Sequence, residues 1–457
     1  MDEDPIFPDT DYDLSFTSCT STTTDHTFAS SSARSSLTRS SLNLSFNESR
    51  LSTTTTTTTN NTPLHDRPHR KSDPHWSAIK AATALSSDGS LHLSHLKLVR
   101  HLGSGNLGRV FLCRLKDCDH GSNFALKVVD RNALTNKKLS HVEMEAQILS
   151  TLDHPFLPTL YAHLEVSHYT CLLIDYCPGG DLHSLLRKQP GFRLPVDAVR
   201  FFAAEVLVAL EYLHALGVVY RDLKPENVLL REDGHIMLSD FDLCFKSDVV
   251  PKLENRILSK TRYNCFGSPK NRSQIQETVP EFIAEPTTAF SKSCVGTHEY
   301  LAPELVTGNG HGNGVDWWAF GIFVYELLNG TTPFKGASKE GTLRNIASTS
   351  NVQFPHVVDR GKEGMAEARD LIEKLLIKDP RRRLGCTRGA TDIKIHPFFN
   401  GIKWPLIRTY RPPVVRGLLR KTKGDVGAVS SYKERRWLWK GISRYFGKNT
   451  GCKRNLN

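Results

Sequence analysis

The sequence has no long apolar run and no pattern of paired cysteines. No stretch approaches the roughly 20 apolar residues that a membrane span needs; residues 201–220, for example, contain Glu205 and Glu211. The acidic first residues are not followed by an apolar segment, so we expect no secretory signal. The 10 cysteines are scattered without a Cys-x-x-Cys pair, which argues against a zinc site or a disulfide framework. We therefore expect a cytoplasmic protein, with the nucleus or the inner surface of a membrane as further locations.

Acidic residues are scarce at the C-terminal end. The net charge is +11 overall, but the residues from Gly401 onward carry 15 lysines and arginines against two acids, Asp425 and Glu434. Between Arg435 and Phe446 these cations alternate with aromatic side chains. That mixture favours an anionic membrane surface as the partner of the tail. The alternatives for the tail are a nuclear or nucleic-acid role and a merely solvated segment. Of these, we do not expect a nucleic-acid partner.

The chain divides into three parts by composition. Residues 1–95 are rich in Ser and Thr and poor in aromatics, so we predict a disordered head. From residue 96 to residue 399 the pattern is that of a folded domain, and residues 400–457 form a C-terminal extension with the basic tail. Short apolar runs predict strands at 96–102, 110–115, 124–129 and 171–176. Apolar stripes predict helices at 140–152, 196–216, 314–328 and 365–377.

These elements predict an α+β fold with two lobes, a small β-rich lobe at 96–177 and a larger helical lobe at 178–399. A capping box, Ser140-x-x-Glu143, predicts the start of the first helix. Glu145 falls on the apolar stripe of the same helix, and an acid on such a face usually has a partner.

A glycine-rich loop follows the first predicted strand. A dinucleotide-binding loop would lead directly into a helix, whereas here a strand follows, which suits a hairpin folded over phosphates. Alone, the pattern also fits an ordinary glycine-rich hairpin. The residues that we assign to nucleotide binding in this loop are Leu102, Gly103, Ser104, Gly105, Asn106, Leu107, Gly108 and Val110.

Two further motifs supply charges for phosphoryl transfer. Lys127 lies inside an apolar strand, and Glu145 follows at the distance needed for an ion pair that holds the ammonium over the nucleotide phosphates. In the run Tyr220-Arg221-Asp222-Leu223-Lys224-Pro225-Glu226-Asn227, Asp222 is the candidate that accepts the hydroxyl proton and Lys224 the cation for the γ-phosphate. Asn227 and Asp240 are the oxygen ligands that we predict for Mg²⁺.

With these motifs the chain resembles a eukaryotic protein kinase of the serine/threonine type. Asp240-Phe241-Asp242 replaces the usual Asp-Phe-Gly, a departure that plant AGC kinases of class VIII share. The motifs that resemble the AGC group are His154-Pro155-Phe156-Leu157, Tyr220 in place of His, Asp316-Trp317-Trp318 and His396-Pro397-Phe398-Phe399. The interval of 62 residues from Asp240 to Ala302 implies an activation-segment insert at about 247–286, which we expect to be flexible. That insert and the Ser293–Tyr300 sequence are similar to the WAG and PINOID subgroup.

The resemblance also implies roles for single residues. Ser293 would be the phosphorylated residue of the activation loop, next to Arg221, and Thr297 would belong to the substrate-docking loop, while Glu304 would pair with Arg383. Asp175 and Cys177 would contact adenine through their backbone, with Ile174 as the gate behind them. Asp181, Glu226 and Glu326 would hold substrate arginines, and Asp181 would also reach the ribose.

The implied activity is transfer of the ATP γ-phosphate to Ser or Thr in Arg-flanked sites, with ATP and Mg²⁺ as cofactors. The implied substrates are cytosolic loops of auxin efflux carriers at the plasma membrane, and an upstream activating kinase is a further implied partner. We expect a monomer. The alternative from another class is a catalytically impaired kinase-fold scaffold or adaptor at the plasma membrane.

Overall fold

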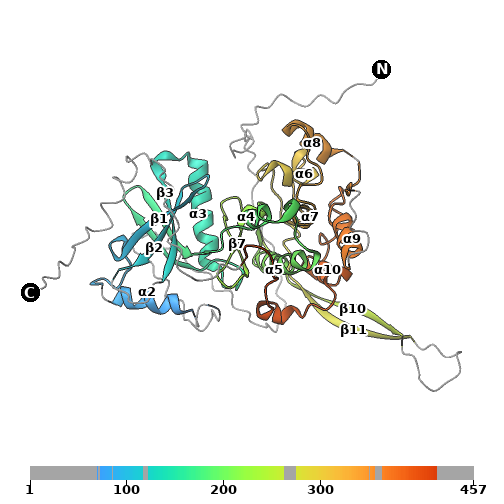
Figure 1. Ribbon diagram of the computed structural model, residues 1–457, viewed down its shortest axis with the longest axis horizontal. Coiled ribbons are helices and arrows are strands. Elements are labelled where there is room, and N and C mark those ends of the chain that lie inside the picture. The colour runs from blue at the N-terminus through green and yellow to red at the C-terminus, as the bar shows by residue number, and fades with distance from the viewer. Residues whose placement is uncertain are drawn as a thin grey trace, which may run out of the picture.

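The computed structural model describes residues 69, 73–84, 86–116, 122–261, 274–348, 350–355 and 363–418. Figure 1 shows two lobes, a smaller one built on a sheet and a larger one built mainly of helices. The predicted α+β, two-lobed architecture is therefore confirmed. Among the described residues, no helix combines the length and the apolarity that crossing a membrane would require.

The small lobe is a five-stranded antiparallel sheet with the order β1-β2-β3-β5-β4. The strands are β1 (Leu96–Ser104), β2 (Arg109–Leu115), β3 (Asn123–Asp130), β4 (Leu160–Val166) and β5 (Tyr169–Asp175). The four predicted strands are confirmed to within two residues at each end. The sequence reading missed β4, in which a register shift after Leu160 breaks the apolar alternation.

The central strand β3 is covered on both faces, which is why it reads as a continuous apolar run. Alternate residues of a strand point to opposite faces, so Leu126 and Val128 face one layer and Lys127 and Val129 face the other. Val129 packs against Val142 of α3 (Asn136–Thr151). Lys127 is thereby directed at that helix.

Helix α3 begins earlier than its predicted capping box. Thr135 is the N-cap, and its hydroxyl accepts a hydrogen bond from the Lys138 amide at 3.4 Å. Ser140 lies inside the helix, where its hydroxyl donates to the Lys137 carbonyl at 2.7 Å. The prediction of a helix start at Ser140 is wrong because a threonine one turn earlier supplies the cap.

Part of the predicted head is folded. Helix α2 (Pro74–Ala84) packs Ile79, which is 1% exposed, on the outer face of the small sheet. The hydroxyl of Tyr161 on β4 lies 2.6 Å from an Asp73 carboxylate oxygen at the start of this helix. The boundary predicted at residue 95 is therefore about twenty residues too late. Residues 1–68, 70–72 and 85 of the head lie outside the described residues.

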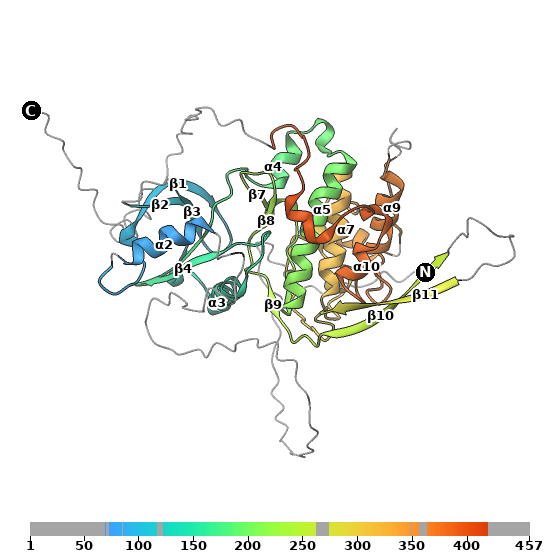
Figure 2. The ribbon, with the colours of Figure 1, turned by 90° about the horizontal axis from the view of Figure 1, so that it is seen from below.

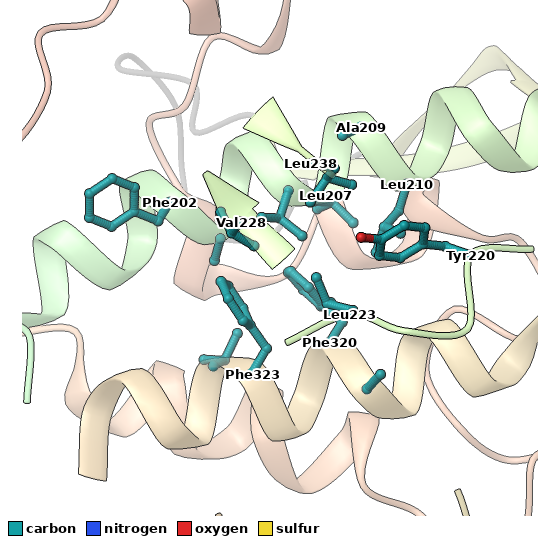
Figure 3. Packing of buried hydrophobic residues seen from close by; sticks show 14 of the residues in the cluster. Phe202, Leu207, Ala209, Leu210, Tyr220, Leu223, Val228, Leu238, Phe320 and Phe323 are labelled. Atoms are coloured by element: carbon teal, nitrogen blue, oxygen red, sulfur yellow. The ribbon is translucent and has the colours of Figure 1, made fainter. Parts of the chain in front are cut away.

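The large lobe is built around two long helices, α5 (Val196–Ala215) and α7 (Gly314–Asn329), whose predicted positions are confirmed. Figure 3 shows Tyr220 and Leu223, from the segment after α5, pointing into the core between these helices. Both side chains are at most 1% exposed, so the segment is anchored by its apolar residues. The helices of this lobe are α4 (Leu182–Arg187), α5 (Val196–Ala215), α6 (Pro303–Val306), α7 (Gly314–Asn329), α8 (Lys339–Ala347), α9 (Met365–Leu375) and α10 (Ala390–Lys394).

Two short antiparallel pairs bring the predicted catalytic motifs together. Strand β6 (Val218–Val219) pairs with β9 (Phe245–Lys246), and β7 (Val228–Leu230) pairs with β8 (Ile236–Leu238). The segment 220–227 lies between β6 and β7, and the segment 239–244 lies between β8 and β9. The β7–β8 turn therefore reverses the chain and sets Asp240 beside Asp222.

The predicted insert contains a regular antiparallel ribbon. Strand β10 (Lys252–Thr261) pairs with β11 (Gln274–Ile283), and Figure 1 shows the ribbon projecting from the large lobe, away from the small one. In Figure 2 the inner end of the ribbon lies beside α5. Arg388 bridges this end to the lobe, since its guanidinium contacts Glu254 on β10 and Glu281 on β11. The expectation of a flexible segment reaching to about 286 is wrong at this inner end, which is docked.

Candidate active site

The glycine-rich loop joins β1 to β2 and leaves room on one side. A Cβ atom added to Gly103 or Gly105 would meet nothing within 4 Å, so the backbone there is open to a ligand. A Cβ on Gly108 would lie 2.4 Å from the Val128 carbonyl oxygen, so this glycine is required for packing on β3. An open strip of backbone N–H groups is what phosphate oxygens need.

The other loop residues divide between surface and core. Leu107 is 4% exposed and packs with Val129 under the loop, so its side chain supports the loop from below. The Asn106 side chain accepts a hydrogen bond from Lys138 of α3 at 3.1 Å, and Ser104 is exposed. Leu102 and Val110 are half-buried at the two ends of the hairpin. Their contacts with a nucleotide remain predictions.

Lys127 forms the predicted ion pair. Its ammonium lies 2.7 and 2.8 Å from the two carboxylate oxygens of Glu145 on α3 and 3.2 Å from an oxygen of Asp240. Burial by itself lowers the pKa of Lys127, but the negative charges of Glu145 and Asp240 outweigh it and raise the pKa. The ammonium is therefore held charged between the two lobes, next to the metal-ligand candidate.

Asp222 sits at the centre of a network of donors. The Lys224 ammonium lies 2.7 Å and the Asn227 side-chain nitrogen 2.8 Å from Asp222 Oδ2, and Thr297 donates to Oδ1 at 3.2 Å. Lys224 also contacts the Thr297 hydroxyl at 2.9 Å. Burial raises the pKa of Asp222 while the Lys224 charge opposes that rise. The sequence motif and the threonine of the docking loop thus meet at one carboxylate.

The catalytic segment is held by a residue to which the sequence reading gave no role. Asp316, at the start of α7, is 0% exposed and accepts hydrogen bonds from the backbone amides of Tyr220 at 2.8 Å and Arg221 at 2.7 Å. Arg221 has a φ of +66°, an unfavourable value for a side chain with a Cβ. Two charge-assisted hydrogen bonds hold this backbone turn immediately before Asp222.

The two aspartates of the Asp-Phe-Asp segment lie in different surroundings. Asp240 has a φ of +59° and a partly exposed side chain that faces Lys127. Phe241 is 1% exposed, and its ring packs against that of Tyr220. Asp242 is 4% exposed, and its burial together with the negative charge of Asp240 raises the pKa of Asp242 to about 7. The third position thus adds a buried carboxyl where Asp-Phe-Gly has none.

The side chains of the predicted hinge residues contact other protein groups. The Asp175 carboxylate accepts from the Thr159 amide at 2.7 Å and lies 3.1 Å from the Tyr161 hydroxyl. The Cys177 thiol is buried, 3.6 Å from the sulfur of Met237. Asp181 caps α4, accepting from the Ser184 amide at 2.6 Å. Adenine contacts by the backbone and the ribose and arginine roles of Asp181 remain predictions.

Two of the predicted substrate acids lie near each other. Glu226 is exposed within the catalytic segment 220–227, and Glu326 on α7 accepts a hydrogen bond from the Tyr300 hydroxyl at 2.5 Å. Burial and the nearby charge of Glu226 raise the pKa of Glu326. An acidic pair of this kind repels itself unless a cation binds.

The activation segment is anchored next to Ser293. The guanidinium of Arg221 donates to the Ser291 hydroxyl at 3.3 Å, and the Ser293 amide donates to the same hydroxyl at 3.2 Å. Ser293 thus lies close to Arg221, a half-buried cation. The predicted pair of Glu304 and Arg383 is confirmed as a two-pronged contact at 2.7 and 2.9 Å, with Arg383 2% exposed.

The donor set fits a divalent metal bound together with phosphates. The Asn227 side-chain nitrogen donates both to the Asp222 carbonyl at 2.9 Å and to its carboxylate, which leaves the amide oxygen free for a cation. Within the described ranges, no group of three or more His, Cys, Asp or Glu side chains could hold a metal by itself. Asp240 and Asn227 therefore suit an ion that takes its remaining ligands from phosphate and water.

Comparisons with known proteins agree with this geometry. Residues 96–263 and 274–399 match the protein kinase domain. The serine/threonine-protein kinase WAG1 of Arabidopsis thaliana is 67% identical over 97% of this chain and 94% of its own length. WAG2 of the same plant is 66% identical over 96% of this chain and 92% of its own length. The protein kinase PINOID 2 of Oryza sativa subsp. japonica is 46% identical over 76% of this chain and 83% of its own length.

The chain belongs to the protein kinase family: it is a serine/threonine protein kinase that uses ATP and a divalent metal ion and acts on protein substrates. Its likeness to WAG1, WAG2 and the PINOID kinases over most of their length places it in the WAG and PINOID group of plant AGC kinases.

Proposed function

We propose that this kinase transfers the γ-phosphate of Mg²⁺-bound ATP to Ser or Thr residues that follow arginines in basic sites. Bound Mg²⁺ would neutralise developing charge on the phosphates, with Asp240 and Asn227 as its protein ligands. Asp222 would orient the substrate hydroxyl and accept its proton. Lys127 and Lys224 would hold phosphate oxygens from two sides, one from each lobe.

The observation that carries the basic-site preference is the acidic pair of Glu226 and Glu326. The Glu226 charge raises the pKa of Glu326, and a substrate guanidinium placed between the two would relieve this repulsion. Tyr300 fixes the Glu326 carboxylate from the activation-segment side. Arginine suits such a pair because its planar donors can contact two carboxylates at once.

The preference is tested with a peptide library in which arginine is placed at each position before the Ser. We expect wild type to select arginine and the Glu226→Gln/Glu326→Gln variant to lose that selection with little change in kcat. Glu373→Gln, an acid on the surface of α9, is the control. Equal arginine selection by wild type and the double variant would remove both acids from substrate binding.

We further propose that the physiological substrates are cytosolic loops of auxin efflux carriers, so that the kinase regulates polar auxin transport from the inner face of the plasma membrane. The likeness to WAG and PINOID kinases supports the substrate class. The basic, aromatic tail from residue 419 onward, which lies outside the described residues, supports membrane attachment. Ser293 would receive an activating phosphate, from this kinase or an upstream one, and Arg221 would bind it.

Phosphosite mapping on a purified carrier loop tests this substrate class. We expect incorporation at Arg-flanked serines by wild type and none by Asp222→Asn. Equal incorporation by both proteins would instead favour the catalytically impaired scaffold. Pelleting with phosphatidylserine vesicles, for the full chain and for a chain ending at residue 418, tests the membrane role. Equal pelleting would exclude the tail as the attachment site.

A further inference from the structure

The inner end of the insert is held by a buried carboxylate. Glu285, two residues after β11, is 6% exposed. Its Oε2 atom accepts from the Asn313 side chain at 2.8 Å and lies 2.8 Å from Nδ1 of His214. A Cβ atom at Gly389 would lie 1.7 Å from the other carboxylate oxygen, so Gly389 packs directly against this side chain. The neighbouring Ile283 is 6% exposed and adds an apolar anchor.

His214, near the end of α5, joins this carboxylate to a second one. It is 0% exposed, and its Nε2 atom lies 2.8 Å from Oδ2 of Asp316. A histidine donates from both ring nitrogens only as the imidazolium. Burial alone lowers the pKa of His214, but Glu285 and Asp316 outweigh it and raise the pKa to about 10. The three groups are therefore a buried cation between two anions.

Asp316 connects the triad of Glu285, His214 and Asp316 to the reaction centre. Its Oδ2 atom, which contacts His214, also accepts the Tyr220 amide, and its Oδ1 atom accepts the Arg221 amide. The next residue is Asp222, so an unbroken series of contacts of 2.8 Å or less runs from the insert to the backbone that carries the catalytic carboxylate. A small shift of that backbone would displace Asp222 from its productive geometry.

We propose that Glu285 is a positioning residue for phosphoryl transfer: by holding His214 against Asp316, the docked end of the insert keeps the catalytic segment in its active geometry. Glu285 thus contributes to catalysis through His214 and Asp316. This inference concerns the kinase reaction itself and does not depend on which protein is phosphorylated.

The test compares Glu285→Gln with Glu281→Gln in the full-length protein. The control removes a carboxylate from the same end of the insert, where it contacts Arg388. With an unselected Ser peptide library and ATP at 15 °C, we expect kcat of Glu285→Gln to fall about 10- to 100-fold while the KM for ATP changes little. Glu281→Gln should stay within about twofold of wild type.

Hydrogen exchange separates positioning from loss of the fold. Amides in the peptide that spans Tyr220 to Asp222 should exchange faster in Glu285→Gln than in Glu281→Gln, with core peptides of α7 unchanged. The kcat of His214→Gln/Glu285→Gln should match that of His214→Gln alone, because both act through Asp316. Three results would each overturn the proposal. They are equal kcat values for Glu285→Gln and Glu281→Gln, unchanged exchange at 220–222, and fully additive effects in the double variant.

Discussion

Two buried ion pairs in this kinase resemble each other chemically but differ in origin and role. Lys127 and Glu145 lie 18 residues apart in the small lobe. His214 and Glu285 lie 71 residues apart and join α5 to the end of the insert. The Lys127 side chain also faces the partly exposed Asp240 of the large lobe, whereas His214 is fully enclosed. A cation that borders an open site can act on a ligand, while an enclosed one can only hold protein groups in place.

The same comparison explains which pair a single sequence reveals. The Lys127 pair lies within a fixed series of motifs on one strand and one helix, so spacing alone predicts it. Glu285 lies in a long insert without a motif, and His214 is one of 19 histidines. Nothing in local spacing connects them, because their proximity depends on how the insert returns to the large lobe.

The largest expected effect is the loss of kcat on substitution of Asp222 in the active site. Asp222→Asn removes the proton acceptor while keeping a side chain of similar size, so we expect kcat to fall by about 10²- to 10⁴-fold. The melting temperature should change little, since Lys224 and Asn227 still surround the position. Initial rates with labelled ATP and a thermal melt measure both quantities. A variant with wild-type kcat would show that Asp222 is not the acceptor.

Lys127→Met should affect both activity and stability. The variant lacks the cation for the phosphates and leaves Glu145 buried without its partner, which costs about 3–5 kcal/mol when a buried pair is broken. Lys138→Met, which loses a partly buried contact with Asn106, is the matched control. Chemical denaturation and initial rates are the measurements. A Lys127 variant as stable as the control would mean that the pair contributes no net stability.

The enclosed pair should show its charge in the pH dependence of stability. The pKa of His214 is raised from 6.5 to about 10, because the effect of Glu285 and Asp316 exceeds that of burial. The charge of His214 therefore makes its full contribution to the free energy of unfolding below about pH 6.5. That contribution decreases as the pH rises toward 10, because the unfolded chain has already released the proton there. The melting-temperature difference between wild type and His214→Gln should shrink over that range. A constant difference would show that His214 is neutral in the folded protein.

The smallest effect concerns a third long-range contact, the one that docks α2. Tyr161→Phe removes a hydroxyl that lies between the carboxylates of Asp73 and Asp175. We expect a loss of about 1.5–3 kcal/mol, as for hydrogen bonds to charged groups. Tyr325→Phe, which loses a hydrogen bond to the neutral Gln353 carbonyl, should lose about 0.5–1.5 kcal/mol. The reverse order of stability would mean that α2 adds little to the small lobe.

Sequence reasoning predicted the two lobes, most strands and helices, and the residues that meet at the site. It missed the start of α3 at Thr135, because the Ser140-x-x-Glu143 pattern mimics a cap inside a helix. It also missed α2, because the surrounding head is rich in Ser and Thr and only a few side chains, such as Ile79, face the sheet. The two errors differ in cause: the start of α3 depends on a local cap three residues from its partner amide, whereas α2 depends on strands that are distant along the chain.

The sequence by itself determined the chemistry of this protein: the order of a phosphate loop, a strand lysine, a proton acceptor and two metal ligands defines a serine/threonine kinase. Each of these motifs is a short run of residues that can be read directly, so their order along the chain already indicates the reaction. Only the tertiary structure decided that the insert docks through Glu285, that His214 carries a charge, and that Asp316 holds the catalytic backbone. Such contacts depend on burial and on segments about one hundred residues apart, and no local pattern determines them.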